Sequence, residues 1–282
     1  MLKSIVNYLV DSRDRQRIAI ALAKGAAMMQ VRRVDLTNPA TWEFSGFSQN
    51  GEDGIIEVLR RQLRSPNRDF LEIGSANGVE NNSAWLAVAE RYHGLMIEGN
   101  PRLVERAQRN VVVYSIGTRC QSMFVTLETV PAILGTIQSK TPDVFSLDID
   151  GNDYHIARAL MDGGLRPKIL VAEYNSAYGP ERKLSILYKS DFSIKRAHPS
   201  GLYYGVSIAG WRQFLESQNY RFVTVDQNGV NAFFVDENCF ESKFLDGIHG
   251  LNFAENRAQF LRFNMPSEEQ FSLIADQKFT SI

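Results

Sequence analysis

The feature that most constrains the fold of this chain is an alternation of short apolar runs with longer amphipathic stretches, which begins near Phe44. A strand that is buried on both faces reads as a continuous apolar run, whereas a covering helix repeats its apolar residues every three or four positions. The alternation therefore predicts an α/β domain with a parallel sheet and helices on both faces. Because 44% of the 282 residues are apolar, the chain can bury a core of this size.

Five apolar runs are predicted to be strands: residues 69–73, 94–98, 111–115, 144–150 and 169–174. Helices are expected between them, at residues 82–92, 102–109 and 153–161. A further helix over residues 205–219 precedes two alternating runs, 220–225 and 230–235, which flank the Asn-Gly pair of Asn228 and Gly229. Such a pair is a strong hairpin signal. The sheet is therefore expected to end in an antiparallel hairpin, whereas a dinucleotide-binding dehydrogenase sheet usually stays parallel to its edge.

Residues 1–40 are predicted to form an N-terminal helical arm, and residues 41–282 the main domain. Apolar residues recur at helical spacing in the first ten positions, and a breaker cluster follows at residues 37–40. We expect the arm to pack on the domain or to mediate a homo-oligomer, with a peripheral membrane contact as the alternative. We expect no transmembrane segment and no secretory signal, because the apolar stretch at residues 18–23 is short and charges precede it.

The charge balance and the cysteine content exclude several classes of protein. Thirty-one basic against thirty-two acidic residues leave a formal charge of -1, so the chain lacks the positive field that nucleic-acid binding needs. We therefore expect no nucleic-acid partner. The two cysteines, Cys120 and Cys239, lie far apart and form neither a disulfide framework nor a zinc motif. This usage is typical of a reducing compartment, and we expect a cytoplasmic location.

A glycine turn follows the first predicted strand, in the run FLEIGSANG of residues 70–78. Glycine allows the backbone to approach a ligand closely, and Gly74 and Gly78 follow the acid Glu72. The spacing Gly-x-x-x-Gly differs from the Gly-x-Gly-x-x-Gly that holds a pyrophosphate. S-adenosyl-L-methionine (SAM) has no phosphate, and its ammonium and sulfonium favour nearby carboxylates. We therefore assign Glu72, Gly74, Ser75, Asn77 and Gly78 to a SAM site, with a purely structural turn as the alternative.

The second predicted strand ends in the run IEGNP of residues 97–101. An acid at this position can accept hydrogen bonds from both ribose hydroxyls of a nucleoside. Glu98, Gly99 and Asn100 are therefore predicted to bind the cofactor. Because NAD enzymes use the same device, an NAD-dependent oxidoreductase remains an alternative at this point.

These runs, with FSQNGED at residues 47–53 and SLDIDG at 146–151, resemble the FkbM-like branch of class I SAM-dependent methyltransferases. The resemblance spans roughly residues 45–236, and NAFFV at 231–235 adds to it. It implies a Rossmann-like, doubly wound, mostly parallel sheet with a C-terminal antiparallel hairpin, SAM as methyl donor, and O-methylation of sugars or secondary metabolites.

The resemblance also implies roles for two further segments. The polar run at residues 47–53, with Gln49, is expected to contact the amino-acid end of SAM, and a helix cap by Ser48 or Asn50 is the alternative. Asp148 is assigned to the cofactor site. Related sequences end the fourth strand in Asp-hydrophobic-Glu-Gly, whereas this chain has Asp150 in place of that glutamate.

Polar residues at the ends of strands four and five are expected to face the acceptor, because ligands of open α/β sheets lie at the carboxyl ends of the strands. Asp150, Glu173 and Asn175 offer an oxygen-rich site for Mg²⁺ or Mn²⁺, similar to that of metal-dependent O-methyltransferases. The alternative is that Asp148 holds loop amides and that Glu173 pairs with an arginine.

Methyl transfer requires an aligned acceptor and a base for its proton. Asp150 and His198 are the predicted catalytic residues, while His155 is expected to pack on a helix. The long segment 176–204 carries an excess of Lys and Arg, which predicts an acceptor pocket or lid for an anionic sugar or nucleotide-linked sugar. The sequence thus predicts a SAM-dependent O-methyltransferase for a small-molecule or glycan acceptor. The alternatives are a SAM-binding scaffold without turnover and the NAD-dependent oxidoreductase.

Overall fold

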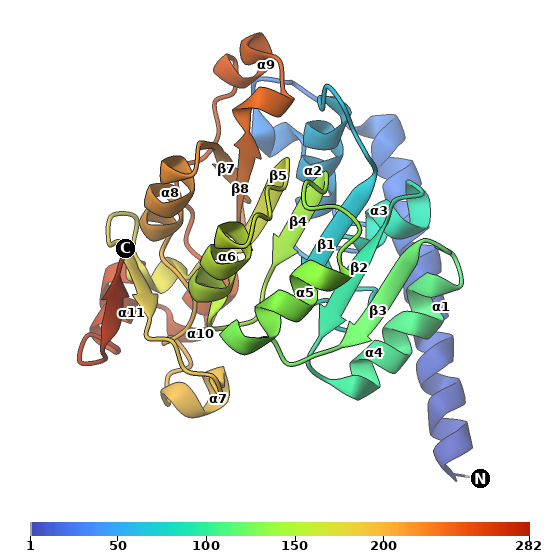
Figure 1. The fold of residues 1–282 in the computed structure, drawn as a ribbon, viewed down its shortest axis with the longest axis horizontal. Coiled ribbons are helices and arrows are strands. Elements are labelled where there is room, and N and C mark those ends of the chain that lie inside the picture. Colours follow the sequence, from blue (N-terminus) through green and yellow to red (C-terminus); the bar gives the residue numbers. More distant parts are fainter. Residues whose placement is uncertain (1) are drawn as a thin grey trace.

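The computed structural model describes residues 2–282, with side chains placed from Leu9 onward. Its main sheet has seven strands in the order β3-β2-β1-β4-β5-β8-β7 (Figure 1). The strands are β1 (Asp69–Ile73), β2 (His93–Glu98), β3 (Thr118–Ser122), β4 (Val144–Leu147), β5 (Ile169–Glu173), β7 (Tyr220–Val225) and β8 (Asn231–Asp236). Strands β1 to β5 pair in parallel, and β8 is antiparallel to both of its neighbours. The strand order reverses between β1 and β4, which is where ligands of such sheets bind.

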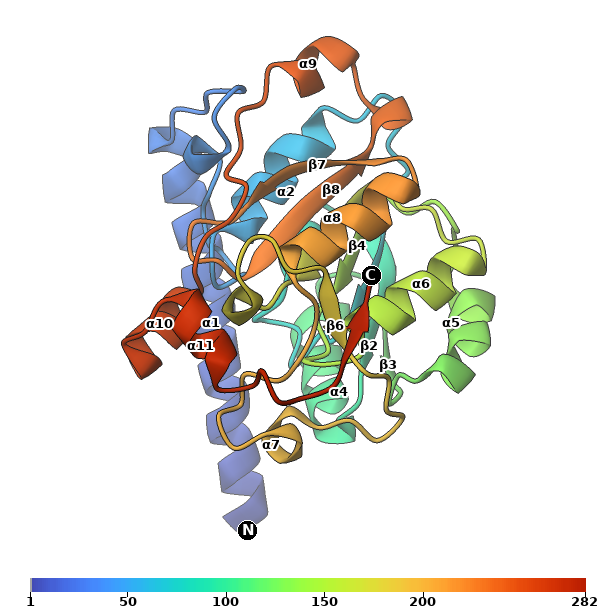
Figure 2. The ribbon, with the colours of Figure 1, turned by 90° about the vertical axis from the view of Figure 1, so that its left-hand side faces the viewer.

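Helices cover both faces of this sheet (Figures 1 and 2). The α-helices are α1 (Leu2–Val31), α2 (Glu52–Arg61), α3 (Ala84–Ala89), α4 (Pro101–Ala107), α5 (Val130–Thr136), α6 (Asp153–Asp162), α7 (Ile194–Ala197), α8 (Ile208–Ser217), α9 (Ser242–Asp246), α10 (Arg257–Phe263) and α11 (Ser267–Ser272). Shorter helical turns are η1 (Pro39–Thr41), η2 (Gln108–Val112), η3 (Leu127–Thr129), η4 (Ser176–Tyr178) and η5 (Glu237–Cys239). A second sheet pairs β6 (Leu184–Ile186) with β9 (Phe279–Ser281).

Alternate residues of each strand supply two separate cores. Leu71 and Ile73 of β1 face the core formed with α5, α6 and α8, whereas Phe70 faces the core formed with α2 and α3. All five residues of β1 are therefore buried, as are those of β5. Burial on both faces explains why these strands read as continuous apolar runs in the sequence. The doubly wound, mostly parallel sheet with its C-terminal antiparallel hairpin is confirmed.

The strand expected at residues 111–115 is wrong. Helix α4 continues into a π-helical turn, η2, and the third strand is Thr118–Ser122. Val104, Ala107 and Val111 are buried at helical spacing, while Val113 is 70% exposed, so the helical period overrides the β-propensity of the valine run. The true strand has the polar sequence TRCQS and lies at the edge of the sheet, where apolar patterning is weak.

Most of the N-terminal arm is one long helix, α1, whose first residues project beyond the body of the protein (Figures 1 and 2). Its later part is anchored, since Ile18 and Ala21 are buried against Phe44 and Trp85. None of the helices searched in the described part of the chain combines the length and apolarity that a bilayer-spanning segment needs.

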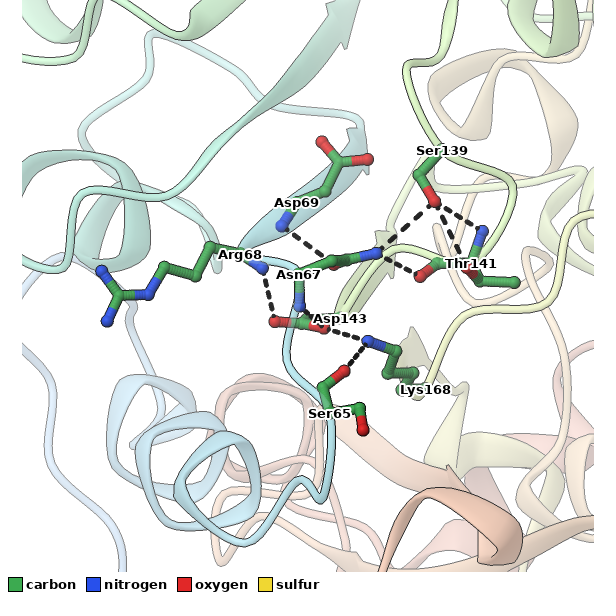
Figure 3. Close-up of polar contacts among 8 residues, drawn as sticks. All are labelled: Ser65, Asn67, Arg68, Asp69, Ser139, Thr141, Asp143 and Lys168. Atoms are coloured by element: carbon green, nitrogen blue, oxygen red, sulfur yellow. Dashed lines mark hydrogen bonds and ion pairs between the residues drawn. The ribbon is translucent and has the colours of Figure 1, made fainter.

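At the amino-terminal ends of the parallel strands, a buried ion pair with further hydrogen-bond partners holds the sheet (Figure 3). Asp143, just before β4, is completely buried and accepts hydrogen bonds from the backbone amides of Asn67 and Arg68. Asp143 also forms an ion pair, since Lys168 Nζ lies 2.7 Å from Asp143 Oδ1. The same ammonium group donates a hydrogen bond to the Ser65 carbonyl. At these strand ends the chain therefore provides a lysine for a carboxylate that it buries.

Candidate functional site

A cavity of about 450 Å³ lies at the carboxyl ends of β1, β2 and β4, whereas Asp143 lies at the amino ends of the strands. This size lies within the usual range for small-molecule sites. Its lining comprises Gln49, Ile73, Gly74, Ala76, Glu80, Ile97, Glu98, Gly99, Leu103, Met123, Phe124, Val125, Asp148, Ile149, Asp150, Asn152 and Phe192. Of the residues that the sequence assigned to the cofactor and the reaction, Gln49, Gly74, Glu98, Gly99, Asp148 and Asp150 line it.

The turn after β1 is shaped by backbone that only particular residues adopt. Gly74 has a φ of 95°, and a Cβ atom there would lie 1.6 Å from the carbonyl oxygen of Asp148. Gly78 also has a positive φ and packs against helix α4, where a Cβ atom would lie 3.0 Å from Ala107. Ser75 donates its amide hydrogen to the Ile97 carbonyl, which joins the turn to β2. The structure thus places Gly74 in the cavity wall, and Ser75 and Gly78 behind it.

Glu98 joins the end of β2 to the turn after β1. Its Oε2 accepts a hydrogen bond from the Ala76 amide at 3.0 Å, and its Oε1 accepts one from the Asn100 amide at 2.8 Å. These bonds fix the carboxylate at the cavity wall and leave further lone pairs for a ligand. Asn100 lies outside the lining and caps helix α4 by accepting a hydrogen bond from the Arg102 amide.

Glu72 lies away from the cavity, although the sequence assigned it to the cofactor. Its carboxylate is buried and accepts hydrogen bonds from the backbone amides of Asn82 and Ser83 and from the Ser83 hydroxyl. Burial raises the pKa of Glu72 to about 7. This carboxylate therefore holds the turn that leads into helix α3. Asn77 is also outside the lining, and its side chain accepts a hydrogen bond from the Val79 amide.

The loop before α2 combines a structural turn with one residue that reaches the cavity. Ser48 Oγ accepts a hydrogen bond from the Asp53 amide, and Asp53 Oδ2 accepts bonds from the amides of Gly46, Phe47 and Ser48. Gly51, with a φ of 100°, stands at the N-cap position of the helix. Ser48 therefore closes this loop, while Gln49 extends to the cavity.

Polar contacts join helix α1 to the cavity wall and to the turn after β1. Arg17 forms an ion pair of 2.7 Å with Glu80, which lines the cavity. Asp14 is buried and pairs with Arg106 of helix α4. Asn110 donates both to Asp14 and to the backbone carbonyl of Asn77, so the arm is connected to the turn after β1.

Three carboxylates converge where β4 and β5 end. Asp148, Asp150 and Glu173 each contribute an oxygen, and these oxygens lie within 4.8 Å of one another. Glu173 Oε2 is buried and has no hydrogen-bond partner among the described residues. Asp150 has a φ of 53°, a left-handed conformation that costs free energy for most residues and is found at functional sites.

The three carboxylates differ in burial, since Glu173 is buried, Asp148 is half-buried and Asp150 is exposed, and their charges repel one another. Burial, followed by the charges of Asp150 and Asp153, raises the pKa of Asp148 to about 8. Burial and the charge of Asp148 hold the pKa of Glu173 well above its usual value. Loss of water also raises the pKa of Asp150, with a smaller contribution from Glu98. A bound cation would relieve this repulsion.

Asn175 does not join these carboxylates, although the sequence grouped it with Asp150 and Glu173. It is completely buried, its amide nitrogen donates to the carbonyls of Leu202 and Tyr204, and its oxygen accepts a bond from the Ala177 amide. Asp148 takes its place in the cluster. Tyr204, which the sequence did not single out, is also buried, and its pKa is raised by burial and then by the charges of Glu173, Asp150 and Asp148.

Neither histidine considered from the sequence lines the cavity. His198 Nδ1 lies 2.8 Å from the Ser200 hydroxyl within its own turn. His155 Nε2 lies 2.9 Å from the Ile186 carbonyl oxygen, and burial lowers its pKa. Asp150 is therefore the candidate base that lies in the cavity wall.

The charged side chains of the lining are all acidic, and one of them, Glu80, is paired with Arg17. Four side chains of the lining are carboxylates (Glu80, Glu98, Asp148 and Asp150), and none is lysine, arginine or histidine in the part of the chain that the structure describes. The remaining wall is mostly apolar, with Phe124 packed beside Gly99, and it also includes Phe192. The cavity is therefore suited to a ligand that carries positive charge and an apolar ring.

A larger surface hollow of about 630 Å³ lies beside strand β7. Its two arginines are already paired, Arg212 with Glu216 at 3.4 Å and Arg221 with Asp246 at 2.8 Å. It contains no group comparable to the carboxylate cluster, and it is not at the carboxyl ends of the parallel strands. We therefore take the acidic cavity as the candidate functional site.

No family model and no curated protein matches the sequence, so membership of the FkbM-like branch stays a prediction. Among solved structures, the chain is similar to an O-methyltransferase from Bacillus cereus in complex with S-adenosylhomocysteine (SAH), at 15% identity over 78% of this chain and 89% of that chain (TM-score 0.44). It is similar to the O-methyltransferase TomG from Streptomyces achromogenes in complex with SAM, at 17% identity over 75% and 93% (TM-score 0.44). It is also similar to cofactor-bound Rv0187 from MTB, at 20% identity over 83% and 97% (TM-score 0.44). Similarity at this level does not assign the activities or ligands of those proteins to this chain.

Proposed function

We propose that this protein is a SAM-dependent methyltransferase that methylates a hydroxyl group of a small polar acceptor. The observation that carries the proposal is the cavity at the ends of β1, β2 and β4, with four carboxylates in its lining and no basic side chain. A sulfonium and an ammonium are the charges that such a lining favours. SAM brings both, together with an adenine ring for the apolar wall.

The residues of the cavity fit the parts of this ligand. Glu98 is held at the end of β2 by two backbone amides and offers its remaining lone pairs to the ribose hydroxyls. Ile97, Leu103 and Phe124 provide apolar surface beside it. Gly74 allows the backbone of the first turn to approach the turn after β4, which closes the cavity at that side.

The same geometry disfavours a dinucleotide such as NAD. A pyrophosphate needs a helix whose amino terminus begins at the glycine turn. Here helix α3 begins at Ala84, well after Gly74, and the carboxylate of Glu72 already accepts the amides that precede the helix. The cavity lining also carries four carboxylates and, among the described residues, no cation that could neutralise two phosphates.

In the reaction, SAM supplies a methyl group on a good leaving group, the sulfonium. The protein has to align the acceptor hydroxyl and accept its proton. Asp150 is suited to the second task, because its carboxylate lies in the cavity wall and its raised pKa makes it a better proton acceptor. The acceptor O–H bond gives its proton to Asp150 as the O–CH₃ bond forms and the S–CH₃ bond breaks.

A second proposal concerns a divalent cation at this cluster. Asp148, Asp150 and Glu173 together provide the hard oxygen ligands that Mg²⁺ and Mn²⁺ prefer, and Glu173 Oε2 is buried with no hydrogen-bond partner among the described residues. Another buried carboxylate, that of Glu72, accepts hydrogen bonds from Asn82 and Ser83 instead. Such an ion would polarise the acceptor oxygen.

The metal proposal predicts a change in thermal stability that does not depend on catalysis. Saturating Mn²⁺ is expected to raise the Tm of the wild type by several degrees, since about 2–4 °C corresponds to 1 kcal/mol of binding stabilisation. In Glu173→Gln the metal-free Tm is expected to rise and the Mn²⁺ shift to disappear. Glu181→Gln, at an exposed position, is the control and should keep the shift. Equal Mn²⁺ shifts in wild type and Glu173→Gln contradict the metal site.

The proposed activity is tested by methyl transfer from SAM labelled in its methyl group. Purified protein is incubated with labelled SAM and an extract of small polar metabolites and glycans, and labelled products are separated from free SAM. The expected result is a labelled product that releases no methanol in base, as for an ether. SAM binding without transfer to any fraction favours a scaffold, and labelled amines contradict the choice of oxygen.

A further inference from the structure

A second cavity, of about 340 Å³, lies beside the first in the segment that connects β5 to α8. Its lining includes the aromatic side chains Tyr188, Phe192 and Tyr203 and the cations Lys189 and Arg196. Phe192 belongs to the lining of both cavities, so the two hollows share a wall. The following inference rests on the proposed methyltransferase function and concerns the acceptor.

The shared wall lies next to the candidate base. A Cβ atom at Gly151 would lie 2.3 Å from the Phe192 ring, so this ring rests on the backbone that directly follows Asp150. Asn152, in the lining of the first cavity, donates to the Lys189 carbonyl at 2.9 Å and accepts from the Lys189 amide at 3.3 Å. The turn after β4 is therefore bound to the segment that forms the second cavity.

The two cavities have opposite charge. The first has four carboxylates and no cation in its lining, whereas the second has Lys189 and Arg196 against one carboxylate, Asp191. Lys189 Nζ lies 3.5 Å from Asp191 Oδ1. Arg196 donates to the backbone carbonyl of Asp191, and no carboxylate within the described residues forms an ion pair with it. The guanidinium thus keeps donors for an anionic group.

We propose that the second cavity binds the acceptor, and that the acceptor is a hydroxylated ring compound with a phosphate or carboxylate group. The ring packs on the aromatic wall, and the anionic group binds to Lys189 and Arg196. Because the carboxylates of the first cavity repel that group, it points away from the cofactor. A hydroxyl on the other side of the ring then points past Phe192 toward the first cavity, whose lining includes Asp150. This arrangement selects both the acceptor class and its orientation.

The test is calorimetric binding to the protein saturated with SAH. Two anionic probes, glucose 6-phosphate and 4-hydroxybenzoate, are compared with the neutral probes glucose and 4-hydroxybenzyl alcohol. The proposal expects at least one anionic probe to bind about tenfold or more tightly than its neutral counterpart. The phosphate and carboxylate arms show which anionic group the site prefers. The double variant Lys189→Gln/Arg196→Gln is expected to lose this preference.

Lys183→Gln removes a charge from the same segment outside the cavity and is the matched control, which should bind the probes as the wild type does. Failure of both anionic probes to bind at millimolar concentration, or equal binding of anionic and neutral probes, overturns the proposal. So does an unchanged preference in the double variant. The SAH titration that precedes each run separates the outcomes, because absent SAH binding contradicts the proposed function itself.

Discussion

Replacing Gly74 by alanine is expected to abolish SAH binding and to lower the free energy of unfolding by about 3 kcal/mol or more. A φ of 95° is costly for any residue with a Cβ atom, and here that atom would lie 1.6 Å from the Asp148 carbonyl oxygen. The turn after β1 or the turn after β4 must move, and both form the cavity wall. The corresponding fall in Tm is about 6–12 °C for a chain of this size.

Gly135→Ala is the matched control for this substitution. Gly135 lies in helix α5, where an added Cβ atom would meet nothing within 4 Å. Alanine is the better helix former, so the variant is expected to be as stable as the wild type or more stable by up to about 1 kcal/mol. SAH titration and thermal unfolding of the two variants check the prediction. Wild-type SAH affinity in Gly74→Ala would contradict the close approach of the two turns.

Asp150→Asn is expected to reduce kcat by about 10²–10⁴-fold on any acceptor that the wild type methylates, with the protein still folded. Asparagine tolerates the left-handed conformation that Asp150 adopts at a φ of 53°, so the backbone of the turn is retained. The amide cannot accept the acceptor proton. Without divalent ions the Tm should stay equal or rise, because one of three clustered carboxylates loses its charge.

The control for this variant is Asp162→Asn, an exposed position at the end of helix α6 whose pairing with Arg158 is loose at 3.8 Å. Single-turnover methyl transfer and thermal unfolding are measured for both proteins. A normal kcat in Asp150→Asn removes this residue from the mechanism. A large loss of Tm in the same variant shows instead that its carboxylate holds the turn.

The sheet was predicted well because strands that are buried on both faces appear in the sequence as continuous apolar runs. The first strand was predicted with the bounds that the structure has, Asp69–Ile73, and the hairpin followed from its Asn-Gly pair. The third strand was missed because an edge strand needs no apolar face. A valine-rich run nearby has high β-propensity, yet helix packing determines its conformation.

The site was predicted less completely, because a motif shows residue types and not the direction in which side chains point. Glu72 and Glu98 both follow the pattern of an acid at a strand end, but the structure places Glu98 in the cavity and Glu72 under the start of α3. Asn175 binds backbone carbonyls, and Asp148 joins the carboxylate cluster in its stead. Phe124 was missed because it follows the misplaced third strand.

The carboxylates at the two ends of the parallel strands have different partners, and this difference indicates what kind of ligand the cavity binds. At the amino ends Asp143 is paired with Lys168, and no ligand is needed to satisfy it. At the carboxyl ends the carboxylates lie close together, and burial and mutual repulsion raise the pKa of Asp148 to about 8. Holding carboxylates this close together costs stability, which the charge of Lys195 offsets only in part at Asp150. We infer that a cationic ligand offsets this cost when it binds.

The most direct test of this account is a calorimetric titration of the wild-type protein with SAM, SAH and NAD⁺ under one set of conditions. The account predicts saturable binding of SAM and SAH at one site per chain, and no heat of binding with NAD⁺. Binding of NAD⁺, or the absence of heat with both SAM and SAH, would contradict the assignment of the acidic cavity to a cationic nucleoside.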